Sequence, residues 1–146
     1  MRTLRRPGTS VPRPVTVGAL MSEAAFTVDP RLSLTAAAAE MRAHRIGSLI
    51  VLGDGEITGI ITERDLIRAL ADGRDPGLTH VSEYMTQSPR TVEARRDAAY
   101  AAALMVRHRL RHLPVVEAGE LVGFLSARDL LALEPWPKAL PALEPW

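Results

Sequence analysis

The chain repeats itself at a fixed offset, and this repetition limits its fold more than any other feature of the sequence. The segment 59–65, which reads Gly-Ile-Ile-Thr-Glu-Arg-Asp, recurs 64 positions later as Gly-Phe-Leu-Ser-Ala-Arg-Asp at 123–129. The match extends without a gap from Val17, which aligns with Val81, through the whole unit. Such self-similarity indicates two copies of one supersecondary unit.

The repeated segment is a motif with two interpretations. Thr62 with Asp65, and Ser126 with Asp129, have the spacing of a capping box, in which a hydroxyl and a carboxylate satisfy the first N–H groups of a helix. A cap does not require the glycine and arginine that both copies share. Alternatively, the turn gathers N–H groups that suit a phosphate, the arginine binds that phosphate, and the carboxylate accepts hydrogen bonds from a ribose diol.

Composition narrows the class of protein. The chain has 146 residues, of which 47% are hydrophobic and only 4% aromatic, so we expect one domain with an aliphatic core. The net charge of +1 provides no strong field toward nucleic acid. The absence of cysteine excludes disulfides, a thiolate nucleophile and cysteine-ligated zinc. No stretch approaches the roughly 18 apolar residues of a membrane span, and no apolar region follows the basic N-terminus. We therefore expect a cytoplasmic protein without a membrane anchor.

Each copy begins with the same predicted elements. A short helical turn ends near Met21 or Met85, and a brief extended segment follows at 27–28 or 91–92. The next segment has apolar residues at helical spacing and predicts a helix. These helices are expected at 34–44 and 98–108.

Each copy ends with a predicted hairpin and a closing helix. The hairpin strands are expected at 49–52 and 57–61, and at 113–116 and 121–125. Asp54-Gly55 between the first pair is a strong hairpin signal, and Ala118-Gly119 lies at the matching place. The motif then opens closing helices near 64–71 and 128–133.

These elements predict a single α+β (mixed α/β) domain. The expected divisions are a basic flexible arm at 1–14, the first repeat at 15–71, a linker at 72–80, the second repeat at 81–133, and a tail rich in proline and tryptophan at 134–146. One repeat alone is marginal in size, so we expect two copies packed about a pseudo-two-fold axis. The shared core is expected to contain Leu49, Val51, Ile60, Leu113, Val115 and Phe124.

The arm and the tail have weaker signals. The arm is basic but has no aromatic residue, so we do not expect a nucleic-acid partner. The tail repeats Ala-Leu-Glu-Pro-Trp, which ends at Trp136 and again at Trp146. Tryptophan is a favoured interface anchor, so the tail either docks a partner or folds back over its own core.

The repeated unit resembles the cystathionine-β-synthase (CBS) domain, and the tandem resembles a CBS pair, or Bateman module. The resemblance covers 15–133 and rests on Gly-apolar-apolar-Thr/Ser-x-x-Asp in both copies, on Met-Ser and Met-Thr after the entry turns, and on the helix-to-hairpin spacing. It implies two β-α-β-β-α repeats with two clefts between them. It also implies that the clefts bind adenosine compounds such as AMP, ADP, ATP or S-adenosylmethionine, and that the module forms head-to-head or head-to-tail homodimers.

The resemblance further implies roles for individual residues. Ribose hydroxyls are held by Asp65 and Asp129, phosphate or ribose is contacted by Thr62 and Ser126, and Arg64 and Arg128 lie where some members place a phosphate-binding charge. The base pockets are walled, partly through backbone groups, by Thr27, Val28, Arg45, Ile46, Gly47, Thr91, Val92, Arg109, Leu110, Arg111 and His112. The second copy has Arg111 and His112 where the first has Gly47 and Ser48, so its cleft is expected to be bulkier and more basic. Which of the two clefts binds a ligand stays open.

Three functions compete. The leading hypothesis is a stand-alone regulatory module that senses an adenosine ligand and signals to a protein partner. The alternative is a structural or interaction dimer whose clefts are vestigial. An enzyme is not expected, because the chain has no nucleophile elbow and no Walker loop, and we expect no catalytic cofactor. His108 and His112 are four residues apart, but the second falls at a strand entry, so no metal site is expected.

Overall fold

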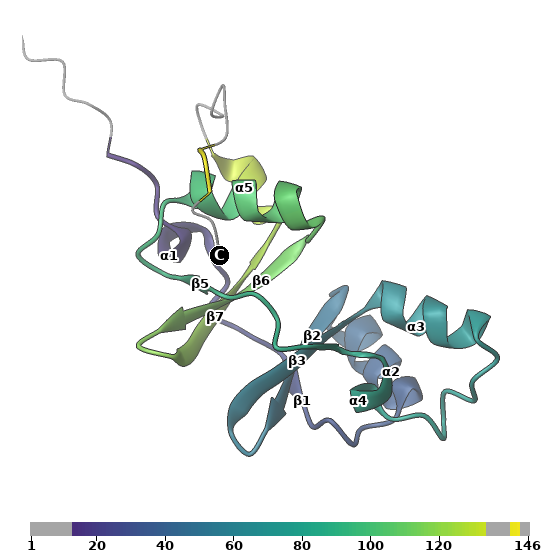
Figure 1. The fold of residues 1–146 in the computed structure, drawn as a ribbon. Helices are drawn as coiled ribbons and strands as arrows, with labels where there is room; N and C mark the ends of the chain where they lie inside the picture. Colours follow the sequence, from purple (N-terminus) through teal and green to yellow (C-terminus); the bar gives the residue numbers. More distant parts are fainter. Residues whose placement is uncertain (1–12, 134–140, 144–146) are drawn as a thin grey trace, which may run out of the picture.

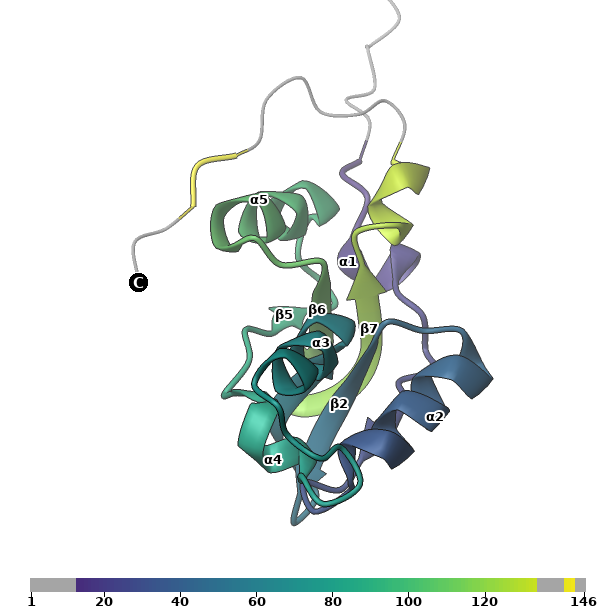
Figure 2. The same ribbon diagram turned by 90° about the vertical axis from the view of Figure 1, so that its right-hand side faces the viewer.

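The computed structural model describes residues 13–133 and 141–143. The predicted arm lies almost entirely outside the described residues, and so do most of the predicted tail and both tryptophans. The described chain forms two lobes (Figure 1), with the strands in the middle of the molecule and the helices around them (Figure 2). Among the described residues, no helix has the length and apolar character needed to cross a membrane.

The two repeats have the same order of elements. The first contains β1 (Thr27–Val28), α2 (Leu34–His44), β2 (Ser48–Gly53), β3 (Glu56–Thr62) and α3 (Glu63–Ala71). The second contains β5 (Val92–Glu93), α5 (Ala98–His108), β6 (His112–Glu117), β7 (Glu120–Ser126) and the 3₁₀ helix η1 (Asp129–Ala132). In each, the first strand pairs in parallel with the second, and the second pairs in antiparallel with the third. The predicted α+β fold of two β-α-β-β-α repeats is confirmed.

The two hairpins match in their irregularities as well as in their order. Both turns place two residues in the left-handed region, Asp54 and Gly55 at φ 52° and 80°, and Ala118 and Gly119 at φ 48° and 81°. Two successive positive φ angles are typical of the type I′ turn, whose twist suits a hairpin. The register of each hairpin also shifts at the same place, after Val51 in the first and at the matching position in the second.

The two entry helices are exchanged between the lobes. Helix α1 (Val17–Leu20) precedes the first repeat in sequence but packs in the lobe of the second, where the N–H of Val17 donates to the carbonyl of Arg96 at 2.8 Å. Helix α4 (Val81–Tyr84) packs in the lobe of the first repeat, where Arg68 donates to the carbonyl of Tyr84 at 2.8 Å. Figure 1 shows α1 beside α5 in one lobe, and α4 in the other lobe with α2 and α3. We call β1–β3, α2, α3 and α4 the first lobe, and α1 with β5–η1 the second lobe.

The exchange extends to the segments that follow these helices. Strand β4 (Thr86–Gln87), after α4, adds to the first sheet by antiparallel pairing with β3. At the matching place, Ser22 forms a bridge with Phe124 of β7. The sulfur of Met85 lies over Gly59, and the sulfur of Met21 lies over Gly123. The motif glycine is therefore the place where the entry methionine of the other repeat packs.

The hydrophobic residues form two cores, so the expected single shared core is wrong. Leu49 and Val51 belong to a cluster in the first lobe, and Leu113 and Val115 to a separate cluster in the second. Side chains alternate along a strand, so these four residues face the helices of their own lobe. Of the two remaining residues, Ile60 is buried but belongs to neither cluster. Phe124 is only half-buried and lines a cleft.

The closing helices differ between the repeats. Helix α3 is an α-helix of nine residues, whereas the predicted helix near 128–133 is a 3₁₀ helix of four residues, Asp129–Ala132. In the sequence, Pro135 comes three residues after Ala132, and a proline limits how far a preceding helix can extend. The first repeat meets its next proline only at Pro76, beyond the end of α3.

Candidate ligand-binding clefts

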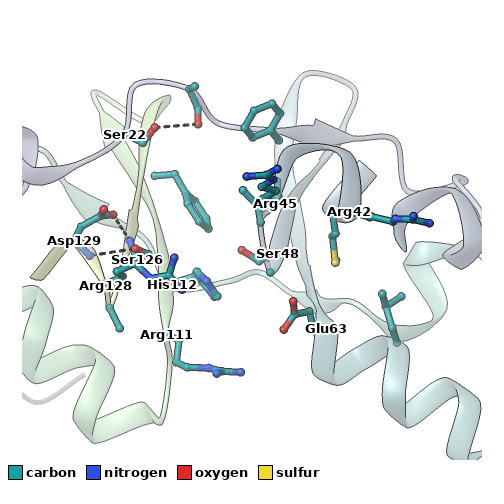
Figure 3. A pocket seen from close by; sticks show the side chains of 18 of the residues that line it. Ser22, Arg42, Arg45, Ser48, Glu63, Arg111, His112, Ser126, Arg128 and Asp129 are labelled. Carbon is teal, nitrogen blue, oxygen red and sulfur yellow. Dashed lines mark hydrogen bonds between the residues drawn. The ribbon is translucent and has the colours of Figure 1, made fainter. Parts of the chain in front are cut away.

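Two clefts lie between the lobes, with volumes of about 850 and 670 Å³. Each combines the motif of one repeat with the end of the long helix of the other. The first cleft joins Ser126 and Asp129 of the second motif to Arg45 at the end of α2 (Figure 3). The second cleft joins Asp65 of the first motif to Arg109 at the end of α5. Neither cleft is built from one repeat alone.

The segments that cross between the lobes supply a further wall of each cleft. Ser22, Ala24 and Phe26 line the first cleft, and Thr86, Ser88, Pro89 and Arg90 line the second. Each segment connects an exchanged helix to the first strand of its own repeat. Within the described chain these are the two covalent connections between the lobes, so each cleft contains one of them.

Both motifs form the cap that their spacing predicts. Oδ2 of Asp65 accepts hydrogen bonds from the N–H of Thr62 at 2.8 Å and from its hydroxyl at 3.3 Å. Oδ2 of Asp129 accepts from the N–H of Ser126 at 2.7 Å, and the Ser126 hydroxyl oxygen accepts from the N–H of Asp129 at 3.2 Å. These bonds use one oxygen of each carboxylate. The other oxygen of Asp65, Oδ1, lies 3.4 Å from the Arg68 guanidinium. The other oxygen of Asp129 accepts no hydrogen bond from the described residues.

The two long helices end on arginines in an unfavourable conformation. Arg45 and Arg109 both have φ 54°, in the left-handed region where glycine usually ends a helix. A residue with a Cβ atom costs roughly 1–2 kcal/mol in this region. Both side chains are exposed and each lines a cleft. An arginine held at such a cost in both repeats points to a use for the guanidinium.

Replacing Arg45 by glycine is expected to leave the free energy of unfolding unchanged or to raise it by up to about 1 kcal/mol, because glycine adopts φ 54° without strain. The measurement is urea denaturation of the unliganded protein. Arg107→Gly is the control, because that residue lies in the last turn of α5 and glycine within a helix costs about 1 kcal/mol. Equal destabilisation by both substitutions would show that the left-handed backbone of Arg45 does not cost stability.

The first cleft contains a buried hydroxyl without a partner. Ser48 is only 3% exposed, and its Oγ has no hydrogen bond among the described residues. Figure 3 shows this oxygen on the cleft wall, close to the carboxylate of Glu63 and across from His112. A buried hydroxyl left unsatisfied costs about 1–3 kcal/mol. A ligand that bonds to Ser48 would therefore remove an existing cost.

His112 and Arg111 line both clefts and separate them. The His112 ring stacks on Phe124 with ring centroids 5.4 Å apart. Burial, and to a lesser extent Arg111, lower the pKa of His112 below its usual value, against the opposing charges of Glu63 and Asp129. His112 is therefore neutral at pH 7, and an anion bound beside it would favour its protonation.

The comparisons with known proteins agree with this architecture. A model of the CBS domain family matches residues 17–72 and 81–134. The chain belongs to the CBS-domain family. A protein of Acidianus ambivalens is 37% identical to it over 107 residues, which are 72% of this chain and 64% of that protein. The chain therefore spans just under two thirds of the length of that curated relative.

Solved CBS structures share the arrangement of the two repeats. A CBS-domain protein from Burkholderia ambifaria superposes with a TM-score of 0.79 at 32% identity, covering 86% of this chain and 100% of that one. A CBS domain protein from Pyrobaculum aerophilum, solved as a complex with AMP, has a TM-score of 0.76 at 28% identity and covers 82% of this chain and 93% of that one. Both likenesses extend over most of the described residues.

The structure brings most of the predicted CBS-site residues to a cleft. The first cleft is lined by Arg45, Ile46, Gly47, Ser126, Arg128 and Asp129. The second is lined by Thr62, Arg64, Asp65, Arg109 and Leu110. Arg111 and His112 line both. Thr27, Val28, Thr91 and Val92 line neither, because β1 and β5 lie at the far edges of their sheets and pair with β2 and β6.

Sequence reasoning missed several lining residues. Phe26 and Arg90 lie on the crossing segments, and Ser48 and Glu63 lie beside predicted residues. Met21 and Met85 mark where the crossing segments begin in the sequence. Assigning these segments to the cleft walls would also have required knowing that the entry helices are exchanged. No group of three or more histidine, aspartate or glutamate side chains suited to a metal occurs in the part of the chain that the structure describes.

Proposed function

We propose that this CBS pair is a stand-alone regulatory module that binds an adenine nucleotide, or a related compound such as S-adenosylmethionine, in at least one cleft. It has no reaction of its own, acts in the cytoplasm and signals to a protein partner. One observation carries this proposal. In each cleft, the motif carboxylate keeps one oxygen that the cap does not use, and it lines the same cavity as the left-handed arginine of the other repeat.

The proposed contacts follow from the chemistry of the groups. The carboxylates of Asp65 and Asp129 accept hydrogen bonds from the ribose hydroxyls, which are donors. A guanidinium presents a planar set of N–H donors that matches phosphate oxygens, so Arg128 and Arg45 bind phosphate in the first cleft. The half-buried side chain of Ile46 packs against the base there. The AMP complex of the Pyrobaculum protein supports an adenosine ligand of this kind.

The mechanism of signalling follows from the position of the clefts. A ligand in either cleft contacts both lobes and one crossing segment, so it favours one relative arrangement of the lobes over others. A ligand can shift such an equilibrium only by the difference in its affinity for the two arrangements. The partner would read that shift at the outer helical surface.

The alternative proposal is a structural or interaction dimer with vestigial clefts. The alanine-rich part of α5 is not available as a dimer surface, because Ala101, Ala102 and Ala103 are buried within their own lobe. Exposed apolar side chains occur instead on α3, where Ile67 and Leu70 are 65% and 61% exposed. Both the regulatory module and the alternative are proposed to be homodimers through such exposed surface.

The test is a thermal-shift panel on the full chain with AMP, ADP, ATP, S-adenosylmethionine and NAD. A ligand at about one hundred times its dissociation constant stabilises the folded state by about 2.7 kcal/mol. For a chain of this length the expected rise in melting temperature is about 5–10 °C. Light scattering of the same samples reports the mass. A dimer whose melting temperature no compound changes would favour the interaction module instead.

A further inference from the structure

The two clefts differ at matching positions of their walls. Where the first cleft has Phe26, the second has Arg90, 64 positions later. Where the first has Gly47, the second has Arg111. The hydroxyl of Ser48 is replaced in the same way by the imidazole of His112. At matching positions, therefore, the first repeat supplies an aromatic ring, a bare backbone and a hydroxyl, which line the first cleft alone. The second repeat supplies two guanidinium groups and an imidazole; that of Arg90 lines the second cleft alone, and Arg111 and His112 line both.

The charges around the second cleft are strongly unbalanced. Five arginines line it, and Asp65 is its single carboxylate among the described residues. The cap already holds that carboxylate through the N–H of Thr62 at 2.8 Å, and Arg68 lies 3.4 Å from its other oxygen. Arg64, Arg109 and Arg111 also line this cleft, whose volume is about 670 Å³. Several cations around one cavity favour a ligand with several negative charges.

The first cleft has more balanced charges and two aromatic rings. Four arginines line it together with two carboxylates, those of Glu63 and Asp129. Its walls include two phenylalanines, and the Phe26 ring stacks on His44 with centroids 4.1 Å apart. The buried Ser48 hydroxyl, which lacks a partner among the described residues, offers a neutral hydrogen bond. These groups favour a base and a sugar over a chain of phosphates.

We infer that the two clefts select ligands by charge. The second cleft takes the more highly phosphorylated compound, a nucleoside diphosphate or triphosphate, and the first takes an adenosine compound with little negative charge. Arg111 and His112 lie between the two sites and line both. A polyphosphate in the second cleft therefore draws the Arg111 guanidinium away from the first cleft. This inference rests on the proposed function, because it divides adenosine ligands between the same two clefts.

The test is calorimetric titration of the full chain with adenosine, AMP, ATP and inorganic tripolyphosphate. Arg90→Gln and Arg109→Gln should each weaken ATP and tripolyphosphate binding at least tenfold and leave adenosine affinity within twofold. Ser48→Ala and Phe26→Leu should weaken adenosine binding and leave ATP affinity within twofold. Arg107→Gln is the matched control, because Arg107 is an exposed arginine of α5 that lines neither cleft, and it should change nothing.

The outcomes separate this inference from the proposed function. Binding of adenosine compounds to both clefts with the same dependence on phosphate number would overturn the inference and leave the proposed function standing. Binding of tripolyphosphate that depends on Arg90 and Arg109, without any adenosine binding, would support charge selection and overturn the proposed function. Failure of every compound to bind would overturn both. Melting temperatures of the unliganded variants show whether any loss reflects misfolding.

Discussion

Gly123→Ala is expected to lower the free energy of unfolding by about 1–3 kcal/mol or more, as overpacking of a close-packed interior does. A Cβ atom on Gly123 would lie 2.5 Å from the sulfur of Met21 and 2.8 Å from the carbonyl oxygen of Ser22. That carbonyl accepts a hydrogen bond from Phe124 at 2.9 Å, so it cannot withdraw without breaking the bridge between the second sheet and the crossing segment. Urea denaturation measures the loss.

Two variants show whether the clash is the cause. Gly77→Ala is the matched control, because its Cβ atom would meet only side-chain oxygens, the nearer being Asp75 Oδ1 at 3.3 Å. It should change the free energy of unfolding by less than about 0.5 kcal/mol. Gly123→Ala combined with Met21→Ala should cost less than the sum of the single changes. Strict additivity would show that Gly123 and Met21 do not share the space that the structure gives them.

Asp129→Asn is expected to weaken ligand binding in the first cleft by roughly 10–100-fold, because a charge-assisted hydrogen bond contributes about 1.5–3 kcal/mol. The amide keeps one oxygen that can accept from the N–H of Ser126, so the cap survives. Its NH₂ group replaces the oxygen that the proposed function assigns to the ribose. Titration with AMP and the ligand-induced shift of melting temperature measure the effect, and Asp65→Asn tests the second cleft.

The matched control for Asp129→Asn is Asp97→Asn. Asp97 caps α5 by accepting from the N–H of Ala99 at 2.8 Å and lines neither cleft. It should change stability slightly and ligand binding not at all. If Asp129→Asn behaves like Asp97→Asn, the motif carboxylate is a cap and nothing more. That result would move the interaction module ahead of the ligand-sensing module.

The repeat made most of the fold predictable, because matching residues at one offset had to form matching elements. Asp54-Gly55 predicted the first hairpin turn, and Ala118-Gly119 adopts the same conformation in the structure. The predicted long helices at 34–44 and 98–108 have the bounds of α2 and α5. These features depend on local backbone preference and side-chain periodicity, which a sequence contains directly.

The exchange of entry helices could not be predicted, because it depends on which of two near-identical cores each helix enters. Positions 17 and 81 match in the repeat and are both valine, so the apolar pattern does not indicate which lobe each entry helix joins. The error over a shared core has the same origin. The walls of the clefts were predicted only where the motif or the helix end supplied them, and Phe26 and Arg90 were missed because the crossing segments became walls through the exchange.

The exchanged helices also determine how such a module can be inherited. Deleting either repeat would remove Val17 or Val81 from the core of the repeat that remains, and both side chains are fully buried. A gene that lost one repeat would encode a lobe without the entry helix that fills its core. Neither cleft would be complete, because each is lined by residues of both repeats. The two halves are therefore retained or lost together, and each is free to change its cleft residues only while it continues to supply its helix to the other.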